Sequence, residues 1–465
     1  MDPTPTPPLK GRGLQKPAPM PDHAHSSDPA VQTQLDRLAA LSPGRDILGL
    51  ERIAELCARL GNPQLQLPRT FHVAGTNGKG STCAYLRAIL EAQGRRVHAY
   101  TSPHLVRFNE RIRLAGTLID DALLAALLEE VLDAAADLQA SFFEVTTAAA
   151  FLAFARIPAD DCIIEVGLGG RLDATNIIPP PAVCGIASLG IDHEAFLLAP
   201  EAGTPDDPAT RIAWEKAGII KPETPVATLA YPPHVRDTIA AKAADVGATL
   251  FPEGDGWEIE QAGDAFRWTS KLGSVAPPLR PRMAGAHQMR NAGLAIAMLR
   301  LAPDPRPNDA EIAQGVADAF WPGRMQRLGA GPLTALLPPD RQLWLDGGHN
   351  PDAGVALAKA LERHAPLHII CGLLSNKDAL GFLRPFANRI ASFQAVPIPG
   401  HEHHGPRELC HWVQSDLGIV DAQPCEDVTT ALRFIAEHRP AADVLICGSL
   451  YLAGVVLDLN GEWPI

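Results

Sequence analysis

The sequence lacks the features that would place the protein in a membrane, outside the cell or on nucleic acid. Its longest apolar run, residues 444–457, contains two glycines and is too short to span a bilayer as a helix. The amino terminus has neither the apolar core of a secretory signal nor the pattern of a transit peptide. Since 40 basic residues face 53 acidic ones, the net charge of -13 opposes a general phosphate-backbone contact. We therefore expect a soluble protein that binds neither membranes nor nucleic acid.

Closely spaced cysteine pairs are also missing. The eight cysteines are scattered without a CxxC motif, and several lie inside apolar, strand-like runs. This usage is typical of buried thiols in a reducing compartment, so we expect a cytoplasmic location. The sequence carries no signal for an oligomer, and we expect a monomer.

The chain divides into a tail and two domains. Residues 1–30 are rich in proline and almost devoid of large apolar side chains, so they cannot bury enough surface to offset chain ordering, and we predict a disordered Pro-rich tail. The remainder is too long for one ordinary core. Pro322 and Gly323 interrupt helical sequence, which predicts a boundary between domains of residues 31–321 and 322–465.

Both domains have the alternating pattern of an α/β fold. In the first, strand-like runs at 71–75, 162–170 and 182–190 alternate with helical patterns such as 120–138 and 144–156. In the second, strand-like runs at 342–350, 367–374, 392–398 and 443–450 alternate with helices. We expect parallel sheets and a ligand cleft between the two domains.

The strongest motif is the glycine-rich segment 74–82, AGTNGKGST, which follows one predicted strand and opens a helix at Ser81. Its glycines let the backbone approach phosphate, Lys79 can neutralise phosphate charge, and the hydroxyl of Ser81 can bind magnesium. The predicted nucleotide-binding loop comprises Gly75, Thr76, Asn77, Gly78, Lys79, Gly80, Ser81 and Thr82. The loop departs from the strict phosphate-loop pattern because Gly80 stands between the lysine and the serine, and a purely structural turn is the alternative.

Three further residues are candidates for the same site. Glu165 lies in a buried-type strand, where an acid without a cation would be costly; either a metal ion or a core arginine could remove that cost. His193 follows another strand and could complete a magnesium site, with a structural histidine as the alternative. Lys216 lies near a helix end, where it could simply compensate the helix dipole.

Other polar segments can be interpreted either as parts of a site or as ordinary structural features. Residues 101–113 combine basic side chains with one aromatic ring, which suits either an anionic ring-bearing substrate or a solvated loop. Glu144 precedes an apolar helix and is expected to be an acid of its first turn. His401, His403 and His404 are expected to form a polar loop, with a zinc site as the alternative.

Eight motifs together carry a family resemblance. In chain order they are GTNGKGST, TSPHLVRFNERI, EVGLGGRLDATN, IDH, EKAGI, HQMRNA, WPGRMQ and DGGHNP. In this order they resemble the folylpolyglutamate synthase branch of the Mur ligase family, from about residue 45 to the C-terminus. The resemblance implies a P-loop Mur-ligase-type ATPase domain, residues 31–321, followed by a smaller Rossmann-like α/β domain, residues 322–465, that closes over the nucleotide and serves glutamate ligation.

The resemblance also implies site residues and cofactors. ATP and two magnesium ions are expected, with Lys79 on the phosphates, Ser81, Glu165 and His193 around magnesium, and Lys216 carrying a carbamate that holds the second ion. Lys79, Lys216 and His193 are the implied catalytic residues. The residues implied to meet the nucleotide across the domain joint are Asn291, Arg324, Asp346 and His349. The residues implied for the acceptor site are Phe143, Asp173 and Ala174, with Ser102, His104 and Arg107 alongside.

The reaction that the resemblance implies is ATP-dependent ligation in folate biosynthesis. ATP would phosphorylate a carboxylate, and the amino group of L-glutamate would displace the phosphate. The implied acceptors are dihydropteroate and folate polyglutamates, and we expect both activities in one enzyme. Two alternatives are a peptidoglycan Mur-type ligase, disfavoured because only about seventy residues precede the phosphate loop, and an ATP-binding switch without ligase activity.

Overall fold

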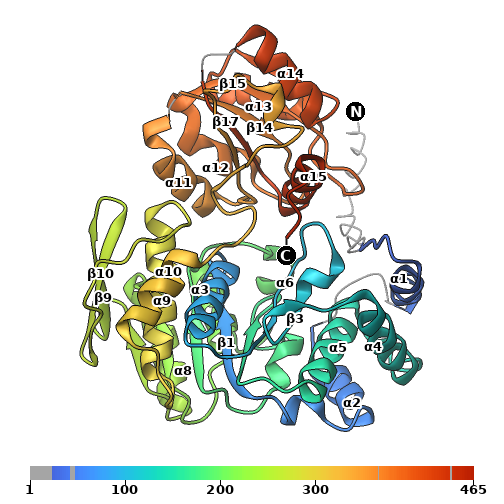
Figure 1. Ribbon diagram of the computed structural model, residues 1–465, viewed down its shortest axis with the longest axis vertical. Coiled ribbons are helices and arrows are strands. Elements are labelled where there is room, and N and C mark those ends of the chain that lie inside the picture. Colours follow the sequence, from blue (N-terminus) through green and yellow to red (C-terminus); the bar gives the residue numbers. More distant parts are fainter. Residues whose placement is uncertain (1–23, 42–47, 365, 440–441, 465) are drawn as a thin grey trace, which may run out of the picture.

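The computed structural model describes residues 24–41, 48–364, 366–439 and 442–464 (Figure 1). The predicted tail lies mostly outside these ranges; the described chain begins at Ala24, and helix α1 (Pro29–Leu41) starts at its last two residues. Within the described ranges, no helix combines the length and apolarity needed to cross a membrane.

The first half of the chain is built on an eight-stranded sheet in the order β4-β3-β2-β5-β1-β6-β7-β8. Strands β2 and β5 to β8 run parallel with β1, whereas β3 and β4 form an antiparallel edge. The strands are β1 (Arg69–Ala74), β2 (Val97–Tyr100), β3 (Ile112–Leu114), β4 (Thr117–Leu118), β5 (Asp161–Glu165), β6 (Val183–Ile186), β7 (Val226–Thr228) and β8 (Leu250–Pro252). The central strands are buried along almost their whole length, as expected for a parallel sheet covered on both faces.

Helices cover both faces of this sheet and enclose separate apolar cores. One core lies under α3 (Lys79–Ala92), α9 (Ala286–Leu301) and α10 (Asp309–Asp318), next to a small antiparallel sheet of β9 (Trp257–Ala262), β10 (Ala265–Ser270) and β11 (Gly273–Ser274). A second core joins α1, α2 (Glu51–Arg59), α4 (Asp121–Ala134) and α5 (Phe142–Arg156). A third lies beside α7 (Pro208–Ala217) and α8 (Pro233–Asp245), with the short α6 (Glu194–Leu197) preceding them.

The second half forms a six-stranded sheet in the order β12-β13-β17-β14-β15-β16. Its strands are β12 (Gln326–Arg327), β13 (Leu343–Leu345), β14 (Leu367–Cys371), β15 (Ile390–Ala395), β16 (Ala422–Pro424) and β17 (Val444–Cys447), and all but β12 are parallel. One face carries α11 (Pro351–Ala360), α12 (Ala379–Leu383) and α13 (Pro406–Leu417); the other carries α14 (Val428–His438) and α15 (Leu450–Asn460). The predicted α/β fold with parallel sheets is confirmed, and Figure 1 shows this sheet stacked above the larger one.

Local sequence explains where several helices begin. The predicted helix 144–156 starts two residues earlier, at Phe142, because Ser141 forms a capping box with Glu144. The amide of Ser141 donates to Glu144 Oε2 at 2.7 Å, which confirms Glu144 as an acid of the first helical turn. Helix α3 begins at Lys79 instead of Ser81, since Gly78, at φ 84°, takes the left-handed conformation that precedes it.

Candidate active site

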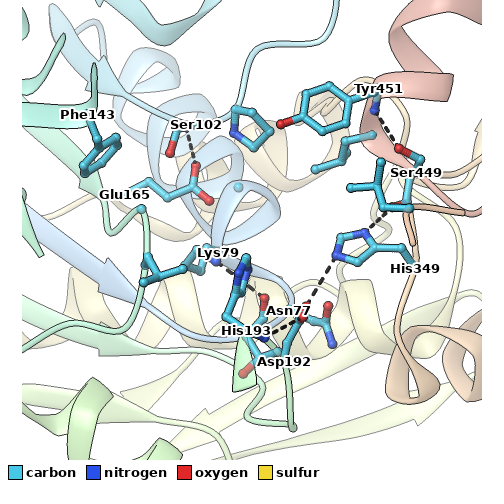
Figure 2. A pocket seen from close by; sticks show the side chains of 18 of the residues that line it. Asn77, Lys79, Ser102, Phe143, Glu165, Asp192, His193, His349, Ser449 and Tyr451 are labelled. Carbon is cyan, nitrogen blue, oxygen red and sulfur yellow. Dashed lines mark hydrogen bonds and ion pairs between the residues drawn. The ribbon is translucent and has the colours of Figure 1, made fainter. Parts of the chain in front are cut away.

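A cavity of about 600 Å³ lies between the two halves of the molecule, at the carboxyl ends of their central strands. It gathers side chains and backbone from segments far apart in the sequence (Figure 2). The sequence-predicted residues that line it are Thr76, Asn77, Gly78, Lys79, Gly80, Ser81, Ser102, Phe143, Glu165, Asp173, Ala174, His193, Asn291, Arg324, Asp346 and His349. Such a cavity can hold a nucleotide beside an acceptor, since ligand pockets typically enclose a few hundred cubic ångströms or more.

The phosphate loop connects β1 to α3. The ammonium of Lys79 donates to the carbonyl oxygens of Gly75 at 3.1 Å and Thr76 at 3.4 Å, so it lies over the loop, where a phosphate would meet it. The hydroxyl of Ser81 is buried and has no hydrogen-bond partner in the part of the chain that the structure describes, which leaves its oxygen available for a ligand. The loop therefore has the anion-binding geometry that the sequence predicts.

The extra glycine of the loop has a packing reason. A Cβ atom at Gly80 would lie 2.6 Å from Nε1 of Trp321, because the indole ring rests on the first turn of α3. Gly78 has the same constraint from Asn291, whose Oδ1 would be 2.5 Å from an added Cβ. The departure from the strict phosphate-loop pattern at Gly80 thus makes room for Trp321, while Gly78 makes room for Asn291 of α9.

Glu165 ends β5 directly beside the loop and is only 4% exposed. One carboxylate oxygen accepts the amide of Ser102 at 3.3 Å, and among the described residues the side chain has no ion pair. Burial raises the pKa of Glu165, while the nearby Lys79 opposes the shift. The core-arginine alternative is therefore not realised in the described chain. The Glu165 carboxylate and the Ser81 hydroxyl line the same cavity, and such oxygen donors fit a hard cation such as Mg²⁺.

Lys216 lies at the end of α7 and is 4% exposed. Its amine makes no hydrogen bond or ion pair with any described residue. Burial, followed by the charge of Lys79, lowers the pKa of Lys216 to about 7. A lysine that only compensated a helix dipole would be solvated, so this environment indicates another role. Lys216 does not line the cavity, but its amine feels the charges of Lys79, Asp173 and Asp192, which do.

His193 itself takes the left-handed conformation (φ 54°) directly before α6, and it lines the cleft. Desolvation by the cleft walls and the charges of Lys377 and His349 lower the pKa of His193, against the attraction of Asp192. The imidazole is therefore held in the neutral form that binds metal ions.

The predicted acceptor residues lie at one end of the cavity. The ring of Phe143, on α5, packs against Gly167 so closely that a Cβ there would be 2.4 Å from its Cζ. Asp173 is buried, and its two oxygens accept the amides of Leu168 at 2.8 Å and Thr175 at 3.0 Å. Burial raises the pKa of Asp173, and those hydrogen bonds oppose it. Together these residues form a niche with one aromatic wall and one carboxylate.

Two of the predicted nucleotide contacts also hold the domain joint. Asp346 accepts the amides of Met325 and Gly348, each at 2.7 Å, so its carboxylate fixes the loop that carries Arg324. Arg324 lines the cavity, with one guanidinium nitrogen 3.3 Å from the carbonyl of Gly323.

Sequence reasoning singled out some members of a polar cluster at the cleft, His349 and Asn77, but missed the cluster itself and its member Lys377. Asp192, in the loop between β6 and α6, pairs with Lys377 at 2.5 Å and with His349 at 3.4 Å. Asn350 donates to Asp192 at 3.2 Å and exchanges two 3.1 Å hydrogen bonds with Asn77 of the phosphate loop. Although burial opposes it, the hydrogen bond from His349 and the charges of His193 and Lys377 hold the pKa of Asp192 well below its usual range. These contacts join the two halves of the molecule (Figure 2).

Some sequence-predicted residues lie elsewhere. Gly75 and Thr82 belong to the loop but do not line the cavity; the Thr82 hydroxyl donates to the carbonyl of Gly78. His104 accepts from Arg111, and Arg107 donates to the carbonyl of Pro464 at 2.9 Å and stacks on Trp463. His104 therefore contacts its own segment, residues 101–113, and Arg107 contacts the C-terminal segment. Their predicted role in substrate binding has no support from this geometry.

The histidines at 401–404 lie in a loop with partners of their own. His401 stacks on Tyr451, the ring of His403 contacts the carbonyl of His401, and His404 contacts the carbonyl of Lys377. Among the described residues, no group of three or more His, Cys, Asp or Glu side chains is placed to hold a metal ion.

Comparison with known proteins gives a consistent set of relatives. No family model matches the chain. The dihydrofolate synthase/folylpolyglutamate synthase of Escherichia coli K12 is 32% identical over 418 residues, covering 89% of this chain and 91% of that protein. The enzyme of the same name from Bacillus subtilis is 33% identical over 427 residues, covering 87% of this chain and 93% of the relative.

Solved structures extend the likeness to the fold. FolC of E. coli in complex with DHPP and ADP has a TM-score of 0.80 at 30% identity, covering 92% of this chain and 97% of its own. A bifunctional folylpolyglutamate synthase/dihydrofolate synthase with Mn, AMPPNP and L-glutamate bound has a TM-score of 0.78 at 31% identity, with the same coverage. The predicted resemblance and the predicted ligase class are thereby confirmed against the peptidoglycan ligase and the switch. The chain belongs to the dihydrofolate synthase/folylpolyglutamate synthase family.

Proposed function

We propose that this enzyme joins L-glutamate to the carboxylate of dihydropteroate and, in a second activity, to reduced folates and their polyglutamates, with ATP as the energy source. The observation that carries the proposal is the cavity that gathers the phosphate loop, an unpaired buried carboxylate and an aromatic niche. Relatives named as dihydrofolate synthase/folylpolyglutamate synthase and a solved structure with AMPPNP and L-glutamate support it.

The chain's own residues supply binding and charge stabilisation. The amides of the loop and Lys79 would hold the nucleotide phosphates, and Ser81, Glu165 and His193 have the oxygen and nitrogen donors to hold magnesium. Bound magnesium supplies neutralisation of the charge that develops on the transferring phosphoryl group. Phe143 and Asp173 would orient the acceptor ring. Closure of the second half excludes water, which protects the acyl phosphate from hydrolysis until the glutamate amine attacks.

Lys216 has a separate proposed role. Its buried amine, with a pKa lowered to about 7, is largely neutral at physiological pH and can react with carbon dioxide to form a carbamate. The reaction turns this neutral amine into an anion within reach of the charges of Lys79, Asp192 and Asp173. Such an anion would provide oxygen ligands for a second magnesium ion.

The proposed roles of the two halves of the chain follow the two sheets. We assign ATP binding to residues 31–321 and closure over the nucleotide to residues 322–465, because β12 and every later strand belong to the second sheet. A cytoplasmic location is supported by the eight cysteines, which are all free thiols.

The test is an assay of phosphate release with ATP, magnesium and L-glutamate, with dihydropteroate or tetrahydrofolate added separately. Turnover should depend on glutamate, and the mass of each product should rise by one glutamyl unit. Omitting glutamate provides the control. Turnover with only one acceptor would contradict the double activity, and nucleotide binding without turnover on either acceptor would contradict the ligase itself.

A further inference from the structure

The carboxylate of the acceptor niche belongs to a short turn of 3-10 helix, η3 (Ala174–Ile177), which Asp173 directly precedes. Asp173 caps this turn, because its Oδ1 accepts the amide of Thr175 at 3.0 Å. The hydroxyl of Thr175 donates to the same oxygen at 2.5 Å. The second carboxylate oxygen, Oδ2, accepts the amide of Leu168 at 2.8 Å. Three donors of the chain therefore hold this carboxylate.

The two oxygens of Asp173 differ in what they leave for a ligand. A carboxylate has about four lone-pair positions, two on each oxygen. Thr175 occupies both positions of Oδ1, whereas Oδ2 keeps one position beyond the amide of Leu168. Since Asp173 lines the cavity, Oδ2 is the oxygen that can accept a hydrogen bond from a ligand there. The direction of the Thr175 hydroxyl thus determines how the carboxylate is presented.

His72 lies beside this hydroxyl, on the central strand β1. Its Nε2 is 2.9 Å from Oγ1 of Thr175, and both side chains are fully buried behind the cavity wall. Burial, followed by the charge of Lys221, lowers the pKa of His72 to about 3, so the imidazole is neutral. Because the one hydroxyl proton of Thr175 is donated to Asp173, the hydrogen between His72 and Thr175 must come from Nε2. The donors therefore form a chain from His72 through Thr175 to Asp173.

Stability alone does not account for a histidine at this position. The residues in register with His72 on β5 and β6 are Ile164 and Cys184, within a sheet that is covered on both faces. Nδ1 of His72 is buried and has no hydrogen-bond partner in the described chain. A buried acceptor without a partner costs at least as much as one neutral hydrogen bond gains, so an apolar side chain would be no less stable here. The one hydrogen bond that the imidazole makes leads to Asp173.

The backbone of η3 is fixed independently of His72. The amide nitrogen of the Asn176 side chain donates to the carbonyls of Arg171 and Gly218, each at 3.0 Å, and Lys221 donates to the carbonyl of Asn176 at 2.6 Å. The turn therefore keeps its place when the imidazole is replaced. What His72 controls is the direction of the Thr175 hydroxyl and, through it, the orientation of the carboxylate.

We propose that His72 is a positioning residue for the acceptor: through the hydroxyl of Thr175 it holds Asp173 so that Oδ2 accepts a hydrogen bond from an N–H group of the acceptor's heterocyclic ring. The proposal rests on the proposed function, in which Phe143 and Asp173 orient that ring. His72 lies behind the cavity wall, out of reach of the acceptor and of the reacting atoms. Its contribution therefore belongs to acceptor binding, separate from nucleotide binding and from the chemical step.

The test is a double-mutant cycle of His72→Leu and Thr175→Val, measured as the KM for dihydropteroate. Each single change should raise this KM about threefold to tenfold, because the hydrogen bond to the ring is misaligned, while kcat and the KM for ATP stay unchanged. Since His72 acts through Thr175, adding His72→Leu to Thr175→Val should cause no further rise. Effects that multiply in the double variant, or an unchanged KM in both single variants, would overturn the proposal.

Conservative variants and a matched histidine separate positioning from folding. His72→Gln keeps an N–H donor near the place of Nε2, and Thr175→Ser keeps the hydroxyl, so both should restore most of the acceptor affinity. His98→Leu is the control, since His98 on β2 is equally buried, contacts the carbonyl of Ile157 and the amide of Ala115, and does not line the cavity. It should lower stability without raising the acceptor KM. An equal rise in His98→Leu would mean a general loosening of the sheet and would contradict the proposal.

Calorimetry distinguishes this proposal from the proposed function. Dihydropteroate is titrated into protein loaded with magnesium and AMPPNP, so the measurement needs no turnover. Weaker binding by His72→Leu than by the unchanged protein supports the positioning role even if no product forms. Equal binding overturns that role and leaves the proposed function standing, whereas no binding by the unchanged protein overturns both. If His72→Leu does not fold, the comparison of Thr175→Val with Thr175→Ser decides in the same way.

Discussion

Lys216 lies in an environment unlike that of an ordinary lysine at a helix end, which is exposed to solvent. Its amine is buried, has no partner among the described residues and has a pKa lowered to about 7. We predict that Lys216→Met abolishes ligation and leaves the free energy of unfolding within about 1 kcal/mol, because methionine keeps most of the aliphatic stem and the amine forms no bond that would be lost. Activity assays and urea unfolding check the two halves of this prediction.

The matched control for that prediction is Lys271→Met, which removes an exposed lysine on the small three-stranded sheet. It should change neither activity nor stability. Near-normal ligation by Lys216→Met would exclude the carbamate. A large loss of stability without any effect on the activity per folded molecule would assign Lys216 a structural role instead.

Among the secondary-structure elements, α3 has one position, Gly80, at which helix propensity and side-chain packing have opposite effects on stability. Alanine is a better helix former than glycine by about 1 kcal/mol, so Gly80→Ala would stabilise an isolated helix. Here, however, the new methyl group would overlap the indole of Trp321, and overpacking typically costs about 1–3 kcal/mol. We predict that Gly80→Ala lowers both stability and ATP affinity, measured by urea unfolding and nucleotide titration. In a Trp321→Ala background the same substitution should become nearly neutral; equal effects in both backgrounds would show that the indole is not the obstacle.

The same elements show what local sequence can predict. The apolar runs around β1, β5 and β6 predict where these strands start to within two residues. The predicted runs 162–170 and 182–190, however, continue five and four residues past the observed strand ends, into the turns that follow. The start of α3 was placed two residues late, because the conformation of Gly78 depends on the phosphate loop as a whole. Trp321 was read only as part of a joint motif, since its contact with Gly80 links positions that are over two hundred residues apart.

At the scale of the whole molecule, long-range contacts limit what the sequence reveals. Glu165 and Ser81 could be singled out from the sequence because Glu165 ends a strand and Ser81 follows another, and the ends of these strands face the cleft. Lys377 could not, because it meets Asp192 across 185 positions and lies in no motif.

The pair of Asp192 and Lys377 should control how firmly the two halves close. Both side chains are less than 10% exposed, and removing one partner of a buried pair costs about 3–5 kcal/mol. That cost falls on the closed state, because Asp192 becomes hydrated when the halves separate. We predict that Lys377→Met shifts the molecule toward an open form, with a larger radius of gyration in solution scattering and a kcat/KM for ATP at least about tenfold lower.

Lys359→Met, on the exposed face of α11, is the control and should leave both quantities unchanged. If Lys377→Met matches that control, closure does not depend on this ion pair, and the hydrogen bonds between Asn77 and Asn350 must hold the halves together.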